Sequence, residues 1–486
     1  MGDKHSSGRS RNGVVWSALE RFGVQGSQFV VSVVLARLLV PADYGLIAML
    51  SIFIALATSL VESGVAQTLI QRKERSGSDL TTALVFNVCV AVALYWVMFF
   101  AAPFIAQFYD AAELTKVVRW FSLVLIINSL SIVQQALIAI DLAFHRLAVA
   151  SLCGIFVGGA VAIVMAYNGA GVWALVAHQL ISGAVKMTIL WAMSSWRPRD
   201  KFSFQALKDM ASFSSNLMLS GVLHVLYNNI YTLIIGRRYA QAELGLFNYA
   251  TTLSILPSHN LSAIVERALY PVMCEAQSDL QADRDAMSEI LLRHLRLLCF
   301  FVFGAMVGLS VLAKPFIALL LGAAWSGVVP FLQIIAVAYM WDPIMKFLGS
   351  GLKAAGRSSD FLKAESLKKI VGFGILALSV PWGVLGMCYG MIAYAFADMA
   401  IITFYSRRVS PLLGYRNIFC NVAPLAALSI AMGYAIYRLR CAMECAEFSA
   451  LEQVACGAVF GLIIYIGGAL LLGRKEPREI FDLLKR

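Results

Sequence analysis

Charged and amide side chains occur inside long apolar segments of this chain, and their spacing suggests a binding site. In the first apolar segment, Arg21, Gln25 and Gln28 are spaced i, i+4 and i+7, which places them on one helical face. A charge at the centre of a bilayer costs about 2.5–3.5 kcal/mol on insertion scales, so it usually faces a cavity or a partner. The alternative for Arg21 is a position near the interface, where its side chain reaches water.

A second polar stripe follows about two hundred residues later. His224, Asn228 and Tyr231 share one face of another apolar segment, and Asn228 lies 200 positions after Gln28. Lys186 is a lone cation within the sixth apolar segment. The amides are interpreted either as hydrogen bonds between helices or as ligand contacts, and both interpretations stay open.

Carboxylates also enter the apolar segments. Asp342 directly precedes Pro343, which should interrupt the tenth segment, and Lys346 follows at i+4, where the two charges can pair. This pair is either self-neutralised between helices or a switchable pair beside a substrate path. Glu62 and Asp398 are further intramembrane carboxylates. We regard Glu62, Asp342 and Asp398 as candidates for ion coupling.

The composition defines the elements that must hold these residues. The 486 residues are 60% hydrophobic and 14% charged, with a mean hydropathy of +0.77, which excludes an ordinary soluble protein. Apolar segments of roughly 20 residues recur along the chain, and each can cross the bilayer as a helix. The sequence predicts an all-α polytopic membrane protein with about fourteen transmembrane helices. These spans are about 14–36, 44–69, 83–107, 117–140, 149–167, 171–194, 212–236, 244–265, 297–321, 326–352, 368–382, 384–406, 417–437 and 450–473.

The distribution of basic residues predicts the orientation. Most of the 39 Lys and Arg residues lie in the two termini and in alternate loops, whereas the opposite side has few. Positive loops face the cytoplasm, so both termini should be cytoplasmic. The net charge of +11 is therefore a topology signal, and because it is divided among short loops it does not indicate nucleic-acid binding.

A short motif at a helix joint is repeated in the second half of the chain. Residues 37–46 align without a gap with residues 237–246, and Arg37, Gly45, Arg237 and Gly245 are among the matched positions. The match predicts a duplicated membrane lobe, although Arg also suits any helix C-terminus. We expect two pseudo-symmetric six-helix lobes, residues 1–200 and 201–410, followed by two extra helices and a basic tail over 411–486.

No enzymatic motif is recognisable in the sequence. P-loop, GxSxG, HExxH and dinucleotide fingerprints do not occur, and the loops are too short for a catalytic domain. The nine cysteines are scattered, so neither a metal nor another cofactor is expected. Cys441 and Cys445 lie close together and are read as free thiols or as a disulfide.

The chain resembles the polysaccharide transporter branch of the multidrug/oligosaccharidyl-lipid/polysaccharide flippase superfamily, and within it the Wzx-type, colanic acid exporter-like proteins. The resemblance extends over nearly the whole chain, and the order of its short motifs is more specific than any one of them. The residues that carry it lie at 35–46, 64–73, 233–237, 244–247, 267–271 and 355–357.

The resemblance implies a function. The substrate would be an undecaprenyl-diphosphate-linked oligosaccharide, flipped from the cytoplasmic to the periplasmic leaflet of the bacterial inner membrane by alternating access. The product would feed exopolysaccharide, capsule or O-antigen (lipopolysaccharide) assembly, with a polysaccharide polymerase and export machinery as further partners.

This function gives roles to the polar residues. Arg21, Lys186 and Lys346 would hold the diphosphate, and Arg37 and Arg237 would lie at the outer mouth. The sugar would be bound by amides and a phenol, namely Gln25, Gln28, Asn228 and Tyr231. Many relatives have an acidic residue where this chain has Tyr231. Ion coupling through a carboxylate at that position is therefore not expected.

Three other functions are compatible with a polytopic chain. A drug or cation exporter of the same superfamily would prefer an acidic, aromatic cavity. A membrane polysaccharide polymerase would need a sizeable periplasmic loop, and the external loops here are short. A structural membrane protein would not need charges within its spans.

Overall fold

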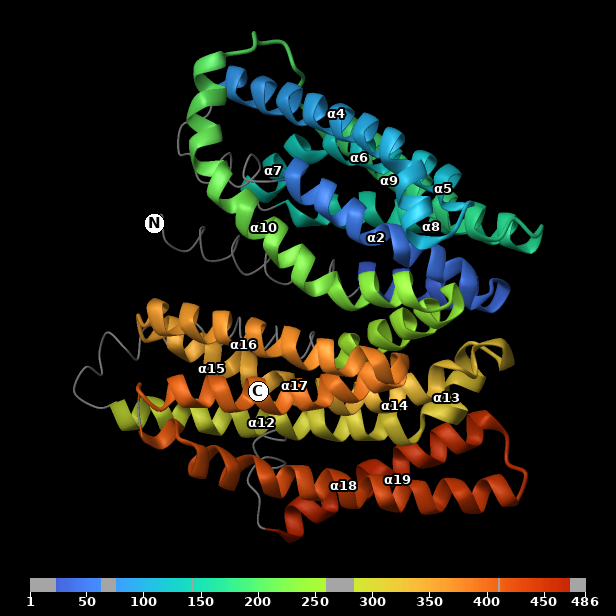
Figure 1. Cartoon of the computed structure of the whole chain (residues 1–486), viewed down its shortest axis with the longest axis vertical. Helices are drawn as coiled ribbons and strands as arrows, with labels where there is room; N and C mark the ends of the chain where they lie inside the picture. Colours follow the sequence, from blue (N-terminus) through green and yellow to red (C-terminus); the bar gives the residue numbers. More distant parts are fainter. Residues whose placement is uncertain (1–22, 63–75, 142, 259–283, 410, 473–486) are drawn as a thin grey trace, which may run out of the picture. The chain divides into compact units, whose positions relative to one another are not determined.

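The computed structural model describes residues 23–62, 76–141, 143–258, 284–409 and 411–472 (Figure 1). Within these ranges every regular element is a helix, which confirms the predicted all-α fold. The chain divides into two compact units, residues 1–245 and 246–486. The predicted lobes at 1–200 and 201–410 describe a repeat of six spans, and that division stays a prediction.

The first unit contains long helices and one span built from three shorter ones. Its helices are Gly23–Leu38, α2 (Pro41–Glu62), α4 (Gly77–Tyr109), α5 (Leu114–Phe121), α6 (Leu123–Ser129), α7 (Ile132–Ile140), α8 (Phe144–Tyr167), α9 (Val172–Met193) and α10 (Phe204–Arg238). The short helices α5, α6 and α7 together form one membrane-length stretch, Leu114–Ile140.

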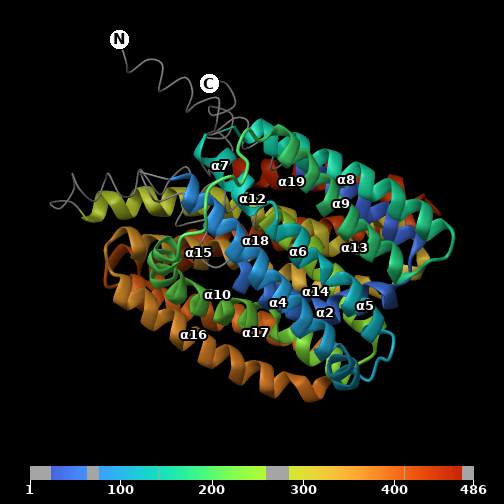
Figure 2. The same ribbon diagram turned by 90° about the horizontal axis from the view of Figure 1, so that it is seen from above.

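The second unit begins within a helix that covers residues 241–258. Its other helices are α12 (Arg284–Val311), α13 (Ala313–Leu320), α14 (Val328–Tyr339), α15 (Asp342–Ala354), α16 (Ser358–Ser379), α17 (Gly383–Ser406), α18 (Tyr415–Cys445) and α19 (Ala450–Leu471). Short 3-10 turns occur at Ala323–Trp325, Val380–Trp382 and Pro411–Leu413. The helices α16 and α17 run side by side (Figure 2).

The described helices match the predicted spans. Ten stretches are long and apolar enough to cross a membrane, and one of them, Ser358–Ser406, turns back at Val380–Trp382 and supplies two spans. Gly23–Leu38, α10 and the helix 241–258 correspond to the other three. The prediction was wrong for the start of the eleventh span, because α16 begins ten residues before position 368. The first turns of α16 are polar, so apolar composition does not indicate that they belong to the helix.

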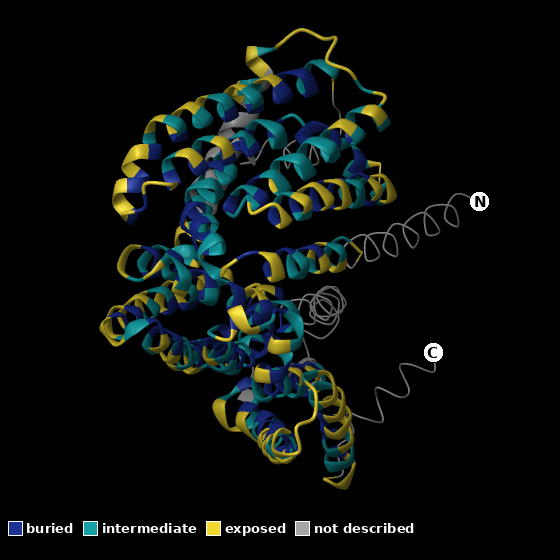
Figure 3. Ribbon diagram, turned by 90° about the vertical axis from the view of Figure 1, so that its right-hand side faces the viewer, coloured by how far each residue is buried: buried dark blue, intermediate teal, exposed yellow. Residues whose placement is uncertain are grey.

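Apolar side chains cover the outside of the helices as well as their contacts. Figure 3 shows buried and exposed residues along opposite faces of individual helices. On α4, for example, Phe100 and Phe104 are 66% and 72% exposed. A water-soluble protein would bury such rings, whereas a bilayer solvates them. Elsewhere glycines bring helices close: Gly154 and Gly158 of α8 pack against Ser182 of α9.

The two matched joints have the same local structure within the first unit. Each helix ends at Leu38 or Arg238, two non-helical residues follow, and the next helix begins at position 41 or 241. In each joint the backbone N–H of the first residue after the helix donates to the carbonyl four residues earlier, at 2.9 Å. The repeated sequence therefore corresponds to a repeated backbone turn.

Glycines bring the two joints into direct contact. A Cβ atom on Gly45 would lie 1.9 Å from the carbonyl oxygen of Gln241, and a Cβ on Gly245 would lie 1.9 Å from that of Pro41. Pro41 and Gln241 are themselves matched positions of the repeat, so the contact is reciprocal. Any side chain would collide with backbone here, which explains glycine at both positions.

Candidate functional site

A break between two helices positions the first charged pair. The helix α14 ends at Tyr339 and α15 begins at Asp342, with Pro343 in its first turn, where proline is tolerated. Lys346 Nζ lies 2.6 Å from Asp342 Oδ2, so the predicted i, i+4 pair is confirmed. Ser258 Oγ donates to the Tyr339 carbonyl at 3.1 Å and faces Asp342 Oδ2 at 3.4 Å. The break between the two helices thus places Asp342 at the start of α15, where Lys346 and Ser258 are its polar neighbours.

A second, more buried pair joins α16 and α17. Lys368 Nζ lies 2.8 Å from Asp398 Oδ1 and 3.0 Å from Glu365 Oε1. The Lys368 and Asp398 side chains are only 6% and 12% exposed. Sequence reasoning identified Asp398 as a lone charge but missed Lys368, because it had placed Lys368 at the edge of a span. The i, i+3 spacing of Glu365 and Lys368 was the available signal.

These two pairs form one electrostatic cluster within the second unit. Trp341 directly precedes Asp342 and Phe396 lies two residues before Asp398, and the centres of these two rings are 5.0 Å apart. The cluster contains three carboxylates (Asp342, Glu365 and Asp398) and two ammonium groups (Lys346 and Lys368). Each predicted carboxylate in it therefore already has a cationic partner in this conformation.

The first unit holds most of the predicted substrate contacts. Gln25 is half-buried and Gln28 exposed on the helix Gly23–Leu38, while Lys186 is half-buried on α9, with its stem near Gly154 of α8. Arg21 lies outside the described residues, as does the side chain of Glu62, which ends α2.

Two residues of the polar stripe on α10, His224 and Asn228, contact each other. Asn228 Nδ2 and His224 Nε2 lie 2.8 Å apart, and Tyr231 is half-buried three residues further on. At the end of the same helix, the Arg237 guanidinium lies 5.4 Å from the centre of the Phe108 ring. Arg37 is exposed at the equivalent helix end. The predicted residues are thus divided between the two units, and only those of the second unit form one described cluster.

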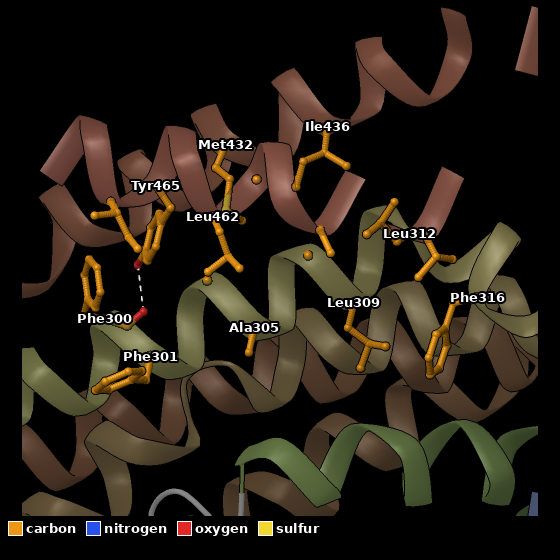
Figure 4. Close-up of a pocket in the computed structure, with 16 residues that line it drawn as sticks. Phe300, Phe301, Ala305, Leu309, Leu312, Phe316, Met432, Ile436, Leu462 and Tyr465 are labelled. Atoms are coloured by element: carbon orange, nitrogen blue, oxygen red, sulfur yellow. Dashed lines mark hydrogen bonds between the residues drawn. The ribbon is translucent and has the colours of Figure 1, made fainter. Parts of the chain in front are cut away.

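An apolar groove is a feature that the sequence did not reveal. It has a volume of about 630 Å³ and lies within the second unit, between α12 and α13 on one side and α18 and α19 on the other (Figure 4). Phe301, Leu309, Ile436 and Leu462 are among its 16 lining residues. Tyr465 closes one end, where its hydroxyl donates to the Phe300 carbonyl at 2.9 Å. Such a wall can accept a hydrocarbon chain but offers nothing to an ion.

The membrane-length helices of the described residues define a polytopic membrane protein. The fold is that of the flippase superfamily inferred from the sequence. It matches "Lipid II flippase MurJ, inward closed conformation" with a TM-score of 0.73 and 13% identity, over 95% of this chain and 100% of that one. It matches an inward-facing multidrug resistance MATE family transporter of the MOP superfamily with a TM-score of 0.62 and 15% identity, over 82% and 98% of the two chains.

The chain belongs to the family of polysaccharide biosynthesis proteins, whose model matches residues 34–330. It is 24% identical to the lipopolysaccharide biosynthesis protein WzxC of Escherichia coli (strain K12), with 87% of each chain covered. It is 23% identical to the succinoglycan biosynthesis transport protein ExoT of Rhizobium meliloti (strain 1021), over 97% of this chain and 95% of the relative. The predicted resemblance is confirmed, and the chain is a transporter rather than an enzyme.

Proposed function

We propose that this protein flips polyprenyl-diphosphate-linked oligosaccharide repeat units from the cytoplasmic to the periplasmic leaflet of a bacterial inner membrane. The observation that carries the proposal is that a chain of the polysaccharide biosynthesis family contains ten membrane-length apolar helical stretches in its described part. Such a protein meets its biosynthetic intermediate in the bilayer. The units would then be used for exopolysaccharide, capsule or O-antigen assembly, with a polymerase and export machinery as partners.

The apolar groove supports a lipid-linked substrate. The membrane-length helices α12, α18 and α19 form most of its walls, so its occupant would come from the hydrocarbon region. An isoprenoid chain is long, carries one methyl branch on each five-carbon unit and has no hydrogen-bonding groups, which suits a wall of Leu, Ile, Phe and Gly residues. We assign the groove to the polyprenyl tail of the substrate.

The charged residues receive the roles that the substrate needs. Lys186, Lys346 and Arg21 would neutralise the diphosphate, Arg37 and Arg237 would act at the outer mouth, and both termini would be cytoplasmic. The sugar would meet the amides and the phenol of Gln25, Gln28, Asn228 and Tyr231. Lys346 already binds Asp342, so it would have to exchange that carboxylate for the substrate. The pair would then switch between two partners during transport.

The experiment uses cells that lack this protein and accumulate the lipid-linked repeat unit. Complementation with the wild type should move that unit to the periplasmic leaflet, as measured by its accessibility to an enzyme added outside spheroplasts. Lys346→Ala should leave most of it cytoplasmic. Repeat units that reach the periplasm without this protein and stay unpolymerised would refute the flippase and favour a polymerase.

Export of a cation or drug is the second candidate, and one observation favours it. The second unit has three carboxylates and two ammonium groups in its cluster, an acidic excess that would attract a cation. Proteoliposomes tested with a fluorescent organic cation decide between the two. Saturable export of the dye, without flipping of a lipid-linked oligosaccharide, would select the exporter.

A further inference from the structure

A basic cavity lies between the end of α17 and the start of α18 in the second unit. It has a volume of about 610 Å³ and is lined by Arg407, Arg408, Gly414, Tyr415, Arg416 and Asn417. We refer to it as the arginine cavity. It is separate from the apolar groove, and none of its residues belongs to the sites assigned above.

The arginine cavity has more positive than negative charge. Arg408 Nη1 lies 3.0 Å from Asp360 Oδ1, and Arg357 Nε lies 3.4 Å from the other oxygen of the same carboxylate. One carboxylate therefore serves two guanidinium groups. Arg407 stacks on Phe404, 4.2 Å from the ring centre, which orients its guanidinium without neutralising it. Arg416 adds a further positive charge to the wall.

A helix N-terminus adds to this positive field. The 31-residue helix α18 starts at Tyr415, its N-cap Gly414 provides no side-chain hydrogen bond, and its first turn has no acidic residue. The first backbone N–H groups of a helix have no partner within the helix, and the helix dipole favours an anion there. Gly414 to Asn417 are themselves part of the wall, so these donors lie at the cavity.

Contacts with neighbouring helices hold the arginine cavity in place. The Tyr415 hydroxyl donates to the Ala400 carbonyl of α17 at 2.7 Å. Arg357 Nη1 donates to the carbonyl of Arg408, which fixes the end of α17 against the start of α16. A site that is already assembled binds its ligand with a smaller loss of conformational entropy.

We propose that the arginine cavity binds a phosphoryl group at the cytoplasmic surface of the membrane. Guanidinium groups form paired hydrogen bonds with phosphate oxygens, and a helix N-terminus is a common second half of such a site. The phosphoryl group would come either from a phospholipid of the cytoplasmic leaflet or from the diphosphate of the substrate before it enters the transport path. The cytoplasmic location rests on the proposed function and its orientation.

The test measures ligand-induced thermal stabilisation of the purified full-length chain. One arm adds inorganic diphosphate to protein in nanodiscs of phosphatidylcholine, and the other replaces part of that lipid with phosphatidylglycerol. At least one arm should raise the melting temperature of the wild type. The double variant Arg407→Gln/Arg416→Gln should lose this shift, with affinity reduced about tenfold for each guanidinium removed. Both side chains are exposed, so folding should be retained.

The control variant Arg199→Gln/Lys201→Gln removes the same charge from exposed positions of another loop and should keep the shift. Stabilisation by diphosphate alone identifies the substrate as the source, stabilisation by phosphatidylglycerol alone identifies the leaflet, and both together identify a shared phosphoryl site. No shift in either arm, or an equal loss in both variants, overturns the proposal. Binding without any flipping by the wild type would refute the proposed function but leave the arginine cavity as a phosphoryl site.

Discussion

Lys368 is the most buried charged residue among the described residues. Its substitution shows how much a buried ion pair contributes to the stability of this protein. Its ammonium group balances Asp398 and Glu365 between α16 and α17. Removal of one partner from a buried pair typically destabilises a protein by about 3–5 kcal/mol, because the other charge stays buried alone.

We therefore expect Lys368→Met to lower the melting temperature of the purified protein strongly. Lys363→Met, at an exposed position of the same helix, should have little effect. The double variant Lys368→Met/Asp398→Leu should recover most of the loss, since no buried charge remains and the Glu365 carboxylate, 36% exposed, can be hydrated. A single variant as stable as the wild type would contradict the importance of the pair.

The Asp342–Lys346 pair leads to a prediction of opposite sign for two neighbouring residues. If Lys346 binds the substrate diphosphate, Lys346→Ala weakens that binding, whereas Asp342→Asn frees the ammonium group and strengthens it. We expect changes of about tenfold in each direction. Binding of a short isoprenyl diphosphate, followed by fluorescence competition, measures both. Equal weakening by the two variants would indicate a structural pair only.

The contacts of single residues were predictable from the sequence only where the partner lies within one helical turn. Asp342 and Lys346 lie one helical turn apart, so their contact follows from the helix period. The partner of Asp398 lies 30 positions earlier, on another helix, and no local rule connects the two. Arg407 and Arg416 likewise come together only because α17 and α18 meet.

The elements themselves were predictable because hydrocarbon permits few alternatives. A segment of roughly 20 apolar residues in a bilayer must be helical, so composition alone located the helices. Helix ends were less predictable. The helix α16 begins with the polar residues Ser358 and Asp360, outside the apolar stretch, and α18 continues to Cys445, past the predicted end at 437. The apolar groove depends on how four helices pack, which the sequence did not indicate.

The groove can be filled without disturbing the helices that form it. Gly308 lines it, and a Cβ atom there would have no neighbour within 4 Å. We expect Gly308→Leu to fold normally yet reduce flipping of the lipid-linked oligosaccharide at least tenfold, because the leucine occupies the space of the polyprenyl tail. Gly467→Leu on α19 is the matched control, since that glycine is equally open but does not line the groove. Wild-type flipping by Gly308→Leu would remove the groove from the transport path.

Gly45, at the first joint, is closely packed, whereas Gly308 is open. A methyl group on Gly45 would overlap the Gln241 carbonyl, and backbone atoms cannot move aside as a flexible side chain can. We expect Gly45→Ala to destabilise the protein by about 1–3 kcal/mol, the usual range for overpacking. Gly374→Ala, at an open position on α16, should leave the stability unchanged or raise it slightly, because alanine favours the helix more than glycine does. Both are measured as thermal unfolding of purified protein, and an unchanged Gly45→Ala would mean that the joint can separate.

At the scale of the whole molecule, the membrane potential should assist the proposed direction of transport. An inside-negative potential favours outward movement of an anion by about 2.3 kcal/mol per charge per 100 mV. Flipping of a diphosphate-linked substrate in proteoliposomes should therefore accelerate when the side equivalent to the cytoplasm is made negative. A rate that does not respond to an imposed potential, with counter-ion movement blocked, would remove the potential as a driving force.

The reciprocal contact of Gly45 with Gln241 and of Gly245 with Pro41 has a consequence for the origin of the chain. Each half gives one glycine and receives one carbonyl, which is the pattern of an isologous interface between two identical subunits. If the halves arose by duplication, the ancestor was a half-length protein that formed a homodimer through this glycine. One substitution there would have changed both sides of the contact at once. Fusion into one chain would have released that constraint, which would account for proline at 41 opposite glutamine at 241.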